Sequence, residues 1–245
     1  MSHDDGYFDH DIAATYDEDH GGADPVLVEQ TVELLSELSG GGEILEFAVG
    51  TGRVALPLAA RGFTVKGIEL SRAMVAQLRK KETGTPLPVT IGDMTDVRVH
   101  GTFSLVFLVF NTIENLTTQE AQIACFNNAA AHLSAGGRFV VETRVPPIQD
   151  LPFGECEMVF AREENHTGVD EFDVSVQSCI SKHVWREGST TKEVAMPFRY
   201  VWPSELDLMA KLAGMELEKR WDDWTKRPFT HLSRHHVSVW KKPSR

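Results

Sequence analysis

The residues with the clearest chemical potential lie in the stretch ILEFAVGTGR, residues 44–53. An apolar segment typical of a buried strand carries one carboxylate, Glu46, and runs into Gly50, Thr51 and Gly52. Glycine lacks a Cβ atom, so such a turn can bend sharply and approach a ligand closely. A strand, a glycine turn and a helix start form the βα unit that receives a nucleotide-like ligand. These residues also fit the G-x-G-x-x-A form of a dinucleotide site. The surrounding sequence must therefore decide which kind of nucleotide-like ligand the turn binds.

A second carboxylate, Glu69, follows Gly52 by seventeen residues, at the end of the apolar segment 64–70. An acid at this offset, on the tip of a second strand, can accept hydrogen bonds from both ribose hydroxyls. An exposed glutamate at a strand end is equally compatible with the sequence. If Glu69 binds ribose, Glu69→Ala should weaken cofactor binding by roughly 2–3 kcal/mol, the scale for hydrogen bonds to a charged group. At an exposed strand tip, the same change should leave the stability of the unliganded protein nearly unaltered.

The elements around these residues alternate regularly. Apolar segments at 44–48, 64–70, 89–91, 103–110 and 138–143 predict strands, and the segments between them carry helical patterns, such as 54–61, 71–81 and 118–133. Asp24 and Pro25 predict the N-cap and first position of an earlier helix. Segments 215–221 and 235–241 predict a final strand pair. We therefore predict an α/β fold with a doubly wound, mostly parallel, seven-stranded, Rossmann-like sheet.

The alternation of strand and helix patterns ends after residue 147. Period-two alternation over 171–180, 182–185 and 192–201, with turns expected at Gly168 and Gly188, predicts an antiparallel β insert after the fifth strand. The predicted organisation is an N-terminal lid segment (1–24, only partly ordered), a core (25–145 and 202–245), and an insert (146–201) that covers the site.

Composition narrows the function classes. The net charge of −12 argues against binding nucleic acid or an anionic membrane surface. No apolar run reaches the roughly 18–20 residues of a membrane-spanning helix. The cysteines at 125, 156 and 179 are widely spaced, which favours reduced thiols in a cytoplasmic protein and no metal site.

The segments ILEFAVGTGR, VKGIELS, IGDM and HLSAGGRFVVE resemble the motifs of class I S-adenosylmethionine-dependent methyltransferases over about residues 42–144. Tyr16-Asp17 resembles the N-terminal Tyr-Asp of that family, and residues 202–215 resemble the helix before its final strand pair. Ala48 stands where the family usually has glycine, and Ser104 where it often has aspartate. The resemblance is to a subgroup that includes sugar N- and glycine-type N-methyltransferases. It implies an enzyme that transfers a methyl group from S-adenosyl-L-methionine to N or O of a small-molecule acceptor.

The resemblance also implies a cofactor site. Loop 48–52 would cradle the methionine part and Glu69 would bind the ribose. Asp93 would bind the adenine amino group while Met94 packs against the ring, and Asn111 would lie near the reacting methyl group. The expected cofactor residues are Tyr16, Glu46, Ala48, Gly50, Thr51, Gly52, Arg53, Glu69, Leu70, Met74, Asp93, Met94 and Asn111.

Methyl transfer is an in-line displacement, so the protein must position the nucleophile and handle its proton. We expect Asn111 to position the acceptor, and Glu114 to take a proton if burial raises its pKa. Other candidate bases are His20, His231, His235 and His236. The expected acceptor contacts are Arg199, Tyr200, Trp202 and His231, although Tyr200 and Trp202 are also compatible with sheet core.

Alternative functions have less support. A short-chain nicotinamide dehydrogenase needs Tyr-x-x-x-Lys, and no tyrosine here has a lysine four residues later. The nucleic-acid amino-methyltransferases carry Asp/Asn-Pro-Pro-aromatic where this chain reads Asn111-Thr112-Ile113-Glu114, and an arsenic methyltransferase needs clustered thiolates. A non-catalytic cofactor-binding protein that forms a homodimer through the insert stays open as an alternative.

Overall fold

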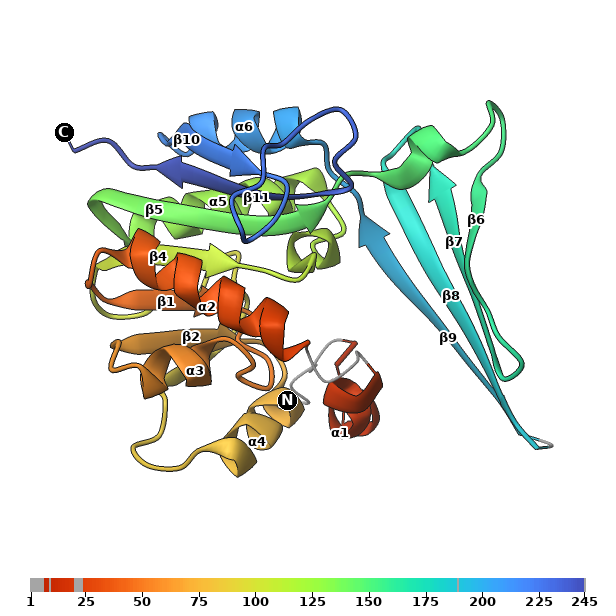
Figure 1. Cartoon of the computed structure of the whole chain (residues 1–245), viewed down its shortest axis with the longest axis horizontal. Helices are drawn as coiled ribbons and strands as arrows, with labels where there is room; N and C mark the ends of the chain where they lie inside the picture. Colours follow the sequence, from red (N-terminus) through yellow and green to blue (C-terminus); the bar gives the residue numbers. More distant parts are fainter. Residues whose placement is uncertain (1–6, 9, 20–23, 189, 245) are drawn as a thin grey trace.

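The computed structural model describes residues 7–8, 10–19, 24–188 and 190–244. Its larger sheet has seven strands in the order β10-β11-β5-β4-β1-β2-β3 (Figure 1). Strands β1 to β5 run parallel, whereas β11 is antiparallel to both β5 and β10. The bounds are β1 Ile44–Phe47, β2 Val65–Glu69, β3 Val89–Ile91, β4 Phe103–Leu108, β5 Leu133–Arg144, β10 Glu216–Trp221 and β11 His235–Lys241. The strand order reverses between β1 and β4, and such a switch point is where open α/β sheets bind ligands. The predicted fold class is confirmed.

Helices cover both faces of this sheet. The helices α2 (Pro25–Ser39), α3 (Ala55–Ala60) and α4 (Arg72–Lys81) pack on one face, and α5 (Gln119–His132) and α6 (Pro203–Leu212) on the other. The predicted helix start at Asp24 is confirmed, because its side chain accepts a hydrogen bond from Val26 N at 3.0 Å. Ser71 caps α4 in the same way, accepting from Met74 N at 3.1 Å. Neighbouring residues of β1 and β4 enter opposite halves of the core, which explains why these strands are almost wholly apolar.

Four antiparallel strands form a separate sheet, which we call the wing: β6 (Glu157–Arg162), β7 (His166–Asp173), β8 (Ser178–Glu187) and β9 (Thr190–Arg199). Figure 1 shows the wing standing beside the core and joined to it at one end. The antiparallel insert after the fifth strand is confirmed. The predicted run 171–180 is wrong in detail, because it crosses the turn between β7 and β8.

The turn predicted at Gly168 is also wrong, since this residue lies inside β7. The reason for a glycine is a close contact rather than a turn. A Cβ atom at residue 168 would stand 2.3 Å from Cε2 of Phe160, whose ring occupies that space. Glycine in a strand often marks such a close approach.

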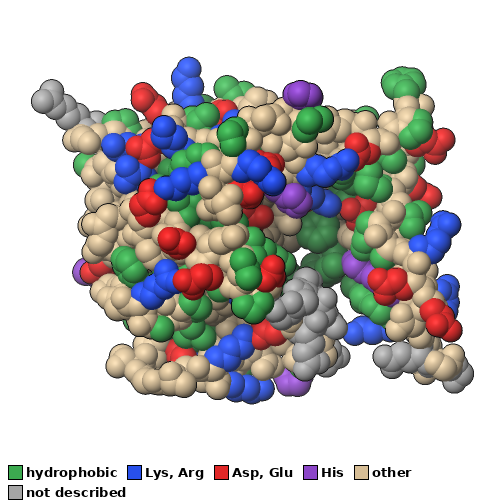
Figure 2. Space-filling view, viewed as in Figure 1, with side chains coloured by type: hydrophobic (Ala, Val, Ile, Leu, Met, Phe, Trp, Pro, Cys, Tyr) green, Lys and Arg blue, Asp and Glu red, His purple; other side chains and the backbone are tan. Residues whose placement is uncertain are grey.

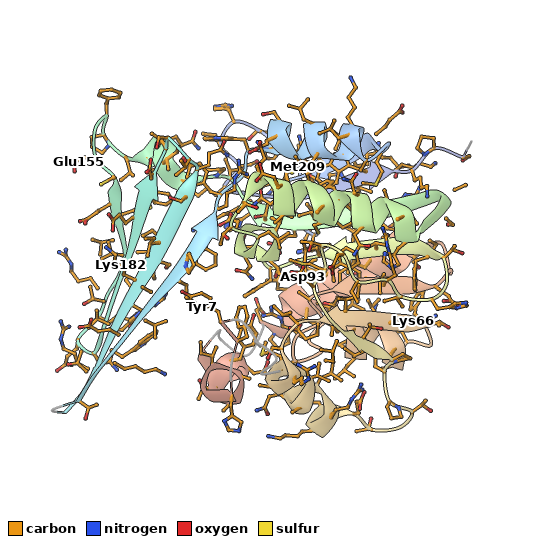
Figure 3. All side chains as sticks on the ribbon, turned by 180° about the vertical axis from the view of Figure 1, so that it is seen from behind. Tyr7, Lys66, Asp93, Glu155, Lys182 and Met209 are labelled. Atoms are coloured by element: carbon orange, nitrogen blue, oxygen red, sulfur yellow. The ribbon has the colours of Figure 1, made fainter. Side chains whose placement is uncertain are left out.

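The N-terminal segment is more regular than expected, because His10–Asp19 forms helix α1. The Thr51 hydroxyl donates to Asp17 Oδ1 at 2.7 Å, and Lys81 forms an ion pair with Asp17. On the other side, the Tyr7 hydroxyl donates to Ala195 O in β9 at 3.1 Å, and Figure 3 shows Tyr7 lying between α1 and the wing. The segment thus contacts both core and wing. His20 lies outside the described residues.

Two 3-10 turns complete the description, η1 (Thr112–Asn115) after β4 and η2 (Pro147–Asp150) after β5. Among the helices of the described ranges, none combines the length and apolar character needed to cross a lipid bilayer.

Candidate active site

The glycine loop after β1 adopts left-handed backbone conformations at three positions. The φ angles are 51° at Ala48, 55° at Gly50 and 82° at Gly52. A Cβ atom on Gly52 would stand 2.9 Å from Leu56 Cγ and 3.0 Å from Leu78 Cγ, so only glycine fits there. Ala48 has no such freedom and pays roughly 1 kcal/mol or more for its positive φ. The loop holds its shape despite the departure from the usual glycine.

Glu69 is tied into this loop. Its Oε2 accepts a hydrogen bond from Gly50 N at 2.7 Å, and its Oε1 accepts from Ser71 N at 2.9 Å. The residue is only 5 % exposed, so it is not the solvated strand-end glutamate that the sequence also allowed. A carboxylate accepts hydrogen bonds through both of its oxygens, which is the chemistry that ligand hydroxyls require.

Glu46 is buried in β1, and its Oε2 has no hydrogen-bond partner among the described residues. Burial raises the pKa of this carboxyl well above its ordinary value, against the opposing effect of the nearby Arg53 guanidinium. A buried polar atom without a partner is costly, so a ligand that donates a hydrogen bond to it is favoured.

The end of β4 carries two consecutive non-glycine residues with positive φ, Phe110 at 63° and Asn111 at 57°. Hydrogen bonds from both residues secure this conformation. Phe110 N donates to Glu142 Oε2 at 2.5 Å, and Asn111 Oδ1 accepts from Arg144 N at 2.7 Å. The guanidinium of Arg53 stacks 3.7 Å from the centre of the Phe110 ring. Strained backbone of this kind persists only where its surroundings enforce it, and it is frequent at functional sites.

Arg144, at the end of β5, joins two carboxylates. Its Nε donates to Glu114 Oε2 at 2.9 Å, and a terminal nitrogen donates to Asp170 Oδ2 of the wing at 3.2 Å. Burial raises the pKa of Glu114 although the Arg144 charge opposes this. For Arg144, burial favours a lower pKa, but the carboxylates of Glu114 and Asp170 outweigh it and the pKa is raised. With all three groups ionised, this triad has one net negative charge.

A cavity of about 560 Å³ lies between the sheet edge and the wing. Figure 2 shows the molecule hollowed between these parts, with hydrophobic and histidine side chains on the wing side. The cavity brings together many of the predicted site residues: Tyr16, Ala48, Gly50, Glu69, Met74, Asn111 and Glu114. The wing adds Asp170, Ser181 and His183, which the sequence analysis did not single out.

Other predicted cofactor residues lie elsewhere. Leu70 is exposed, Thr51 is buried against Asp17, and Met94 packs in the hydrophobic core. Asp93 is exposed, and its Oδ1 accepts from Thr95 N at 2.8 Å. Arg53 lines a second cavity of about 700 Å³ beside α2. Cofactor contacts by these residues remain predictions.

The predicted acceptor residues are not brought into the 560 Å³ cavity. Arg199 is buried and donates to Gln122 Oε1 at 2.5 Å and to Glu205 Oε1 at 2.8 Å. Tyr200 is buried edge-on against Phe172, with ring centres 5.9 Å apart. Arg199 therefore joins the wing to helices α5 and α6 of the core, whereas Tyr200 packs against the wing strand β7. The other two predicted contacts are Trp202, at the start of α6, and His231, an exposed loop residue.

The described histidines proposed as bases, His231, His235 and His236, do not line the 560 Å³ cavity either. His236 is fully buried, and its Nδ1 lies 2.8 Å from Ser238 Oγ. Burial and the charge of Arg220 lower the pKa of His236 to about 3, so it is a neutral core residue near pH 7. His235 lines the second cavity, and burial together with Arg144 lowers its pKa.

Sequence reasoning overlooked Glu142, Arg144, Asp170 and Ser181. The first two end a strand that pairs in parallel with β4, so the rule that ligands bind beyond the carboxyl ends of such strands could have found them. The other two face the cavity because of the strand register within the wing, which no local pattern fixes.

Comparison with known proteins gives one consistent result. Residues 44–137 match the family model described as a methyltransferase domain. The chain is 26 % identical over 202 residues to a cypemycin N-terminal methyltransferase from Streptomyces sp, covering 81 % of this chain and 82 % of the relative. It is 36 % identical over 99 residues to dTDP-3-amino-3,6-dideoxy-alpha-D-glucopyranose N,N-dimethyltransferase from Streptomyces fradiae, covering 40 % and 38 %.

The solved structure of the CcbJ methyltransferase from Streptomyces caelestis is similar over nearly the whole length. Its TM-score is 0.86 at 33 % identity, covering 98 % of this chain and 99 % of that one. The cavity at the switch point of the sheet contains the glycine loop after β1 and Glu69 at the end of β2, which together are typical of a site for a nucleotide-like ligand. The chain belongs to the class I S-adenosylmethionine-dependent methyltransferases.

Proposed function

We propose that this enzyme methylates the nitrogen of an amine in a small-molecule acceptor. The observation that carries this proposal is the composition of the 560 Å³ cavity. It is lined both by Gly50 and Glu69, which are expected to bind the cofactor, and by the Glu114–Arg144–Asp170 triad. A partly enclosed site that contains this net-negative triad favours a cationic ligand over a neutral alcohol, so the protonated form of an amine is attracted to it.

The residues at the cofactor edge fit S-adenosylmethionine. The unpartnered oxygen of Glu46 suits the ammonium group of the methionine part, and the Glu69 carboxylate, at the carboxyl end of β2 beside the glycine loop, suits the ribose hydroxyls. When bound, this cofactor supplies an electrophilic methyl group on sulfur and a neutral leaving group. The protein then has to hold the acceptor in line and let the ammonium group lose its proton to water, because only the neutral amine has a lone pair that can take the methyl group from sulfur.

Asn111 and Glu114 have positioning roles in this proposal. Asn111 is fixed by its bond from Arg144 N, and Glu114 is held by the Arg144 side chain, so both shape the edge on which the amine rests. Fixing the amine in line with the methyl group turns an intermolecular reaction into an effectively intramolecular one, which can contribute several kcal/mol.

The names of the relatives support nitrogen over oxygen as the methylated atom. The cypemycin enzyme is named for an N-terminal position and the Streptomyces fradiae enzyme for N,N-dimethylation of an amino sugar. One relative is named for the N-terminus of cypemycin and the other for a dTDP-linked amino sugar, so they agree on the atom rather than on the molecule.

Methyl transfer from isotopically labelled S-adenosylmethionine to matched amines and alcohols tests the proposal. We expect label in amines and little in the corresponding alcohols, with inhibition by S-adenosylhomocysteine. Label transferred only to alcohols, or to no compound of a panel that includes amino sugars and peptides with free N-termini, would contradict it.

We also propose a cytoplasmic location and leave dimerisation through the wing as a prediction. Three free thiols, Cys125, Cys156 and Cys179, suit a reducing compartment. The exposed side chains of Val159 and Ile180 on the wing suit a contact surface. Light scattering of the full chain and of Ile180→Lys would test the dimer, which predicts a lower mass for the variant.

A further inference from the structure

A single cross-strand row of the wing faces the proposed acceptor space. Met158 of β6 pairs with Asp170 of β7, Asp170 with Ser181 of β8, and Ser181 with Met196 of β9. All four side chains line the 560 Å³ cavity. The row therefore presents a carboxylate and a hydroxyl between two flexible apolar side chains.

Asp170 is the member of this row with unused binding capacity. The residue is 5 % exposed, and its Oδ2 accepts from Arg144 at 3.2 Å. Its Oδ1 is buried and has no hydrogen-bond partner among the described residues. Because an ionised carboxylate oxygen only accepts hydrogen bonds, the group that satisfies it must be a donor.

The surroundings of Asp170 restrict the shape of that ligand. The two methionines flank the polar centre, and Phe160 and Phe198 add further apolar surface to the cavity wall. The ring of Phe160 reaches this position only because Gly168 has no side chain. Small-molecule sites commonly combine apolar walls with a few polar groups that fix orientation.

We infer that Asp170 Oδ1 binds a second hydrogen-bond donor of the acceptor, a hydroxyl or N–H group close to the methylated amine, on a ring or branched aliphatic frame held between Met158 and Met196. This inference rests on the proposed function and adds a specificity determinant to it. A site that contains a buried, otherwise unpaired polar group rejects ligands that lack the matching donor, because the group then stays unsatisfied.

Three probes of similar size test the inference: trans-2-aminocyclohexanol, trans-1,2-diaminocyclohexane and cyclohexylamine. With the intact protein and labelled S-adenosylmethionine, we expect kcat/KM for the amino alcohol or the diamine to exceed that for cyclohexylamine by about 10- to 100-fold, the range for a hydrogen bond to a charged group. The comparison between the first two probes tells whether the preferred donor is a hydroxyl or an amine.

Asp170→Asn is the matching variant, because its amide keeps the size of the side chain but can turn a donor toward the cavity. We expect it to reduce the preference to about 2-fold, mainly through KM, while binding of S-adenosylhomocysteine stays unchanged. Glu171→Gln is the control. Glu171 is the next residue of β7, faces the opposite side and pairs with Lys182 on the surface, so this variant should keep the wild-type preference.

Two results would overturn the inference. One is a wild-type protein without this preference: it methylates all three probes alike, or it methylates other amines but none of the three probes. The other is a preference that survives in Asp170→Asn. If the variant fails to fold, the wild-type comparison of the three probes still decides the matter. Absence of methyl transfer to any amine of the wider panel would instead contradict the proposed function.

Discussion

The carboxylate of Glu69 is bonded to the backbone of Gly50, with 2.7 Å between Oε2 and the amide nitrogen. The end of β2 thereby fixes the glycine loop that follows β1, before any ligand is bound. The second oxygen holds Ser71 N at 2.9 Å and so fixes the start of α4 as well. One side chain links the two segments that are expected to hold the cofactor.

Glu69→Ala should therefore affect folding as well as binding. Removing two hydrogen bonds to a buried carboxylate should lower the free energy of unfolding by roughly 1–3 kcal/mol and weaken binding of S-adenosylhomocysteine at least about 10-fold. This revises the expectation from sequence that stability would be nearly unaltered. Denaturant titration and calorimetry would measure both effects. Glu43→Ala, at an exposed position before β1, is the control, and equal stability of the two variants would refute the prediction.

Ala48→Gly should stabilise the protein. The positive φ of Ala48 costs roughly 1–2 kcal/mol, and glycine removes this strain but adds roughly 0.5–1 kcal/mol of backbone entropy to the unfolded state. The net gain should be up to about 1.5 kcal/mol, visible as a higher denaturant midpoint. Ala59→Gly, at an exposed helical position in α3, should have the opposite sign. A loss of stability in both variants would show that residue 48 is unstrained.

Glu114→Gln should lower stability and kcat/KM without moving the acidic limb of the pH–rate profile. The physical reason is that Arg144 Nε contacts both Glu114 oxygens, at 3.2 and 2.9 Å, so Glu114 acts on the site through Arg144. Breaking a buried ion pair by removing one charge typically costs about 3–5 kcal/mol, and we expect about 2–3 kcal/mol because Asp170 still pairs with Arg144. Exposed Glu120 of α5 provides the control variant. A displaced acidic limb would instead identify Glu114 as the proton acceptor.

His236 should make the protein sensitive to acid. Its folded-state pKa of about 3 lies below the ordinary value of 6.5, so the unfolded chain binds the proton more tightly. The stabilisation is therefore complete above pH 6.5 and is lost as the pH falls from 6.5 toward 3. Over this interval the free energy of unfolding of His236→Gln should fall by several kcal/mol less than that of the wild type. Thermal unfolding at a series of pH values would measure this. Parallel curves for the two proteins would contradict the assignment.

Removal of residues 1–19 should harm turnover more than folding. In the described part of this segment, Ala13 is the one hydrophobic side chain that is fully buried, yet Asp17 and Tyr7 bond to the glycine loop and to the wing. We expect an unfolding midpoint within a few degrees of the full chain and a loss of methyl transfer of at least about 10-fold. Tyr7→Phe removes the wing contact alone and should have a smaller effect. Full activity of the truncated protein would rule out a lid.

The parts of the fold that could be predicted are those that depend on local sequence. The capping side chain of Asp24 and the glycine loop adopt the expected structures because each is determined by a few neighbouring residues. The mostly parallel sheet followed from the alternation of apolar and helical segments, since parallel strands need crossover helices. Glu69 was correctly placed at the end of β2, but its burial depends on contacts from two other segments.

The acceptor side could not be predicted in the same way. Arg199 and Tyr200 look like binding residues because they are polar or aromatic, but distant partners such as Gln122 and Phe172 bury them. Asp170 is one of many acidic residues in the sequence, and its importance depends on the register of β7 against β6 and β8. A shift of one residue would turn Asp170 away from the cavity.

The separation of the chain into two sheets also has an evolutionary consequence. Within the described residues, no strand of the wing pairs with a strand of the seven-stranded sheet, which holds the glycine loop and Glu69. Each wing strand contributes one side chain to the row that includes Asp170. Selection can therefore replace these side chains one at a time and test new acceptors, while the glycine loop and Glu69 keep their sequence.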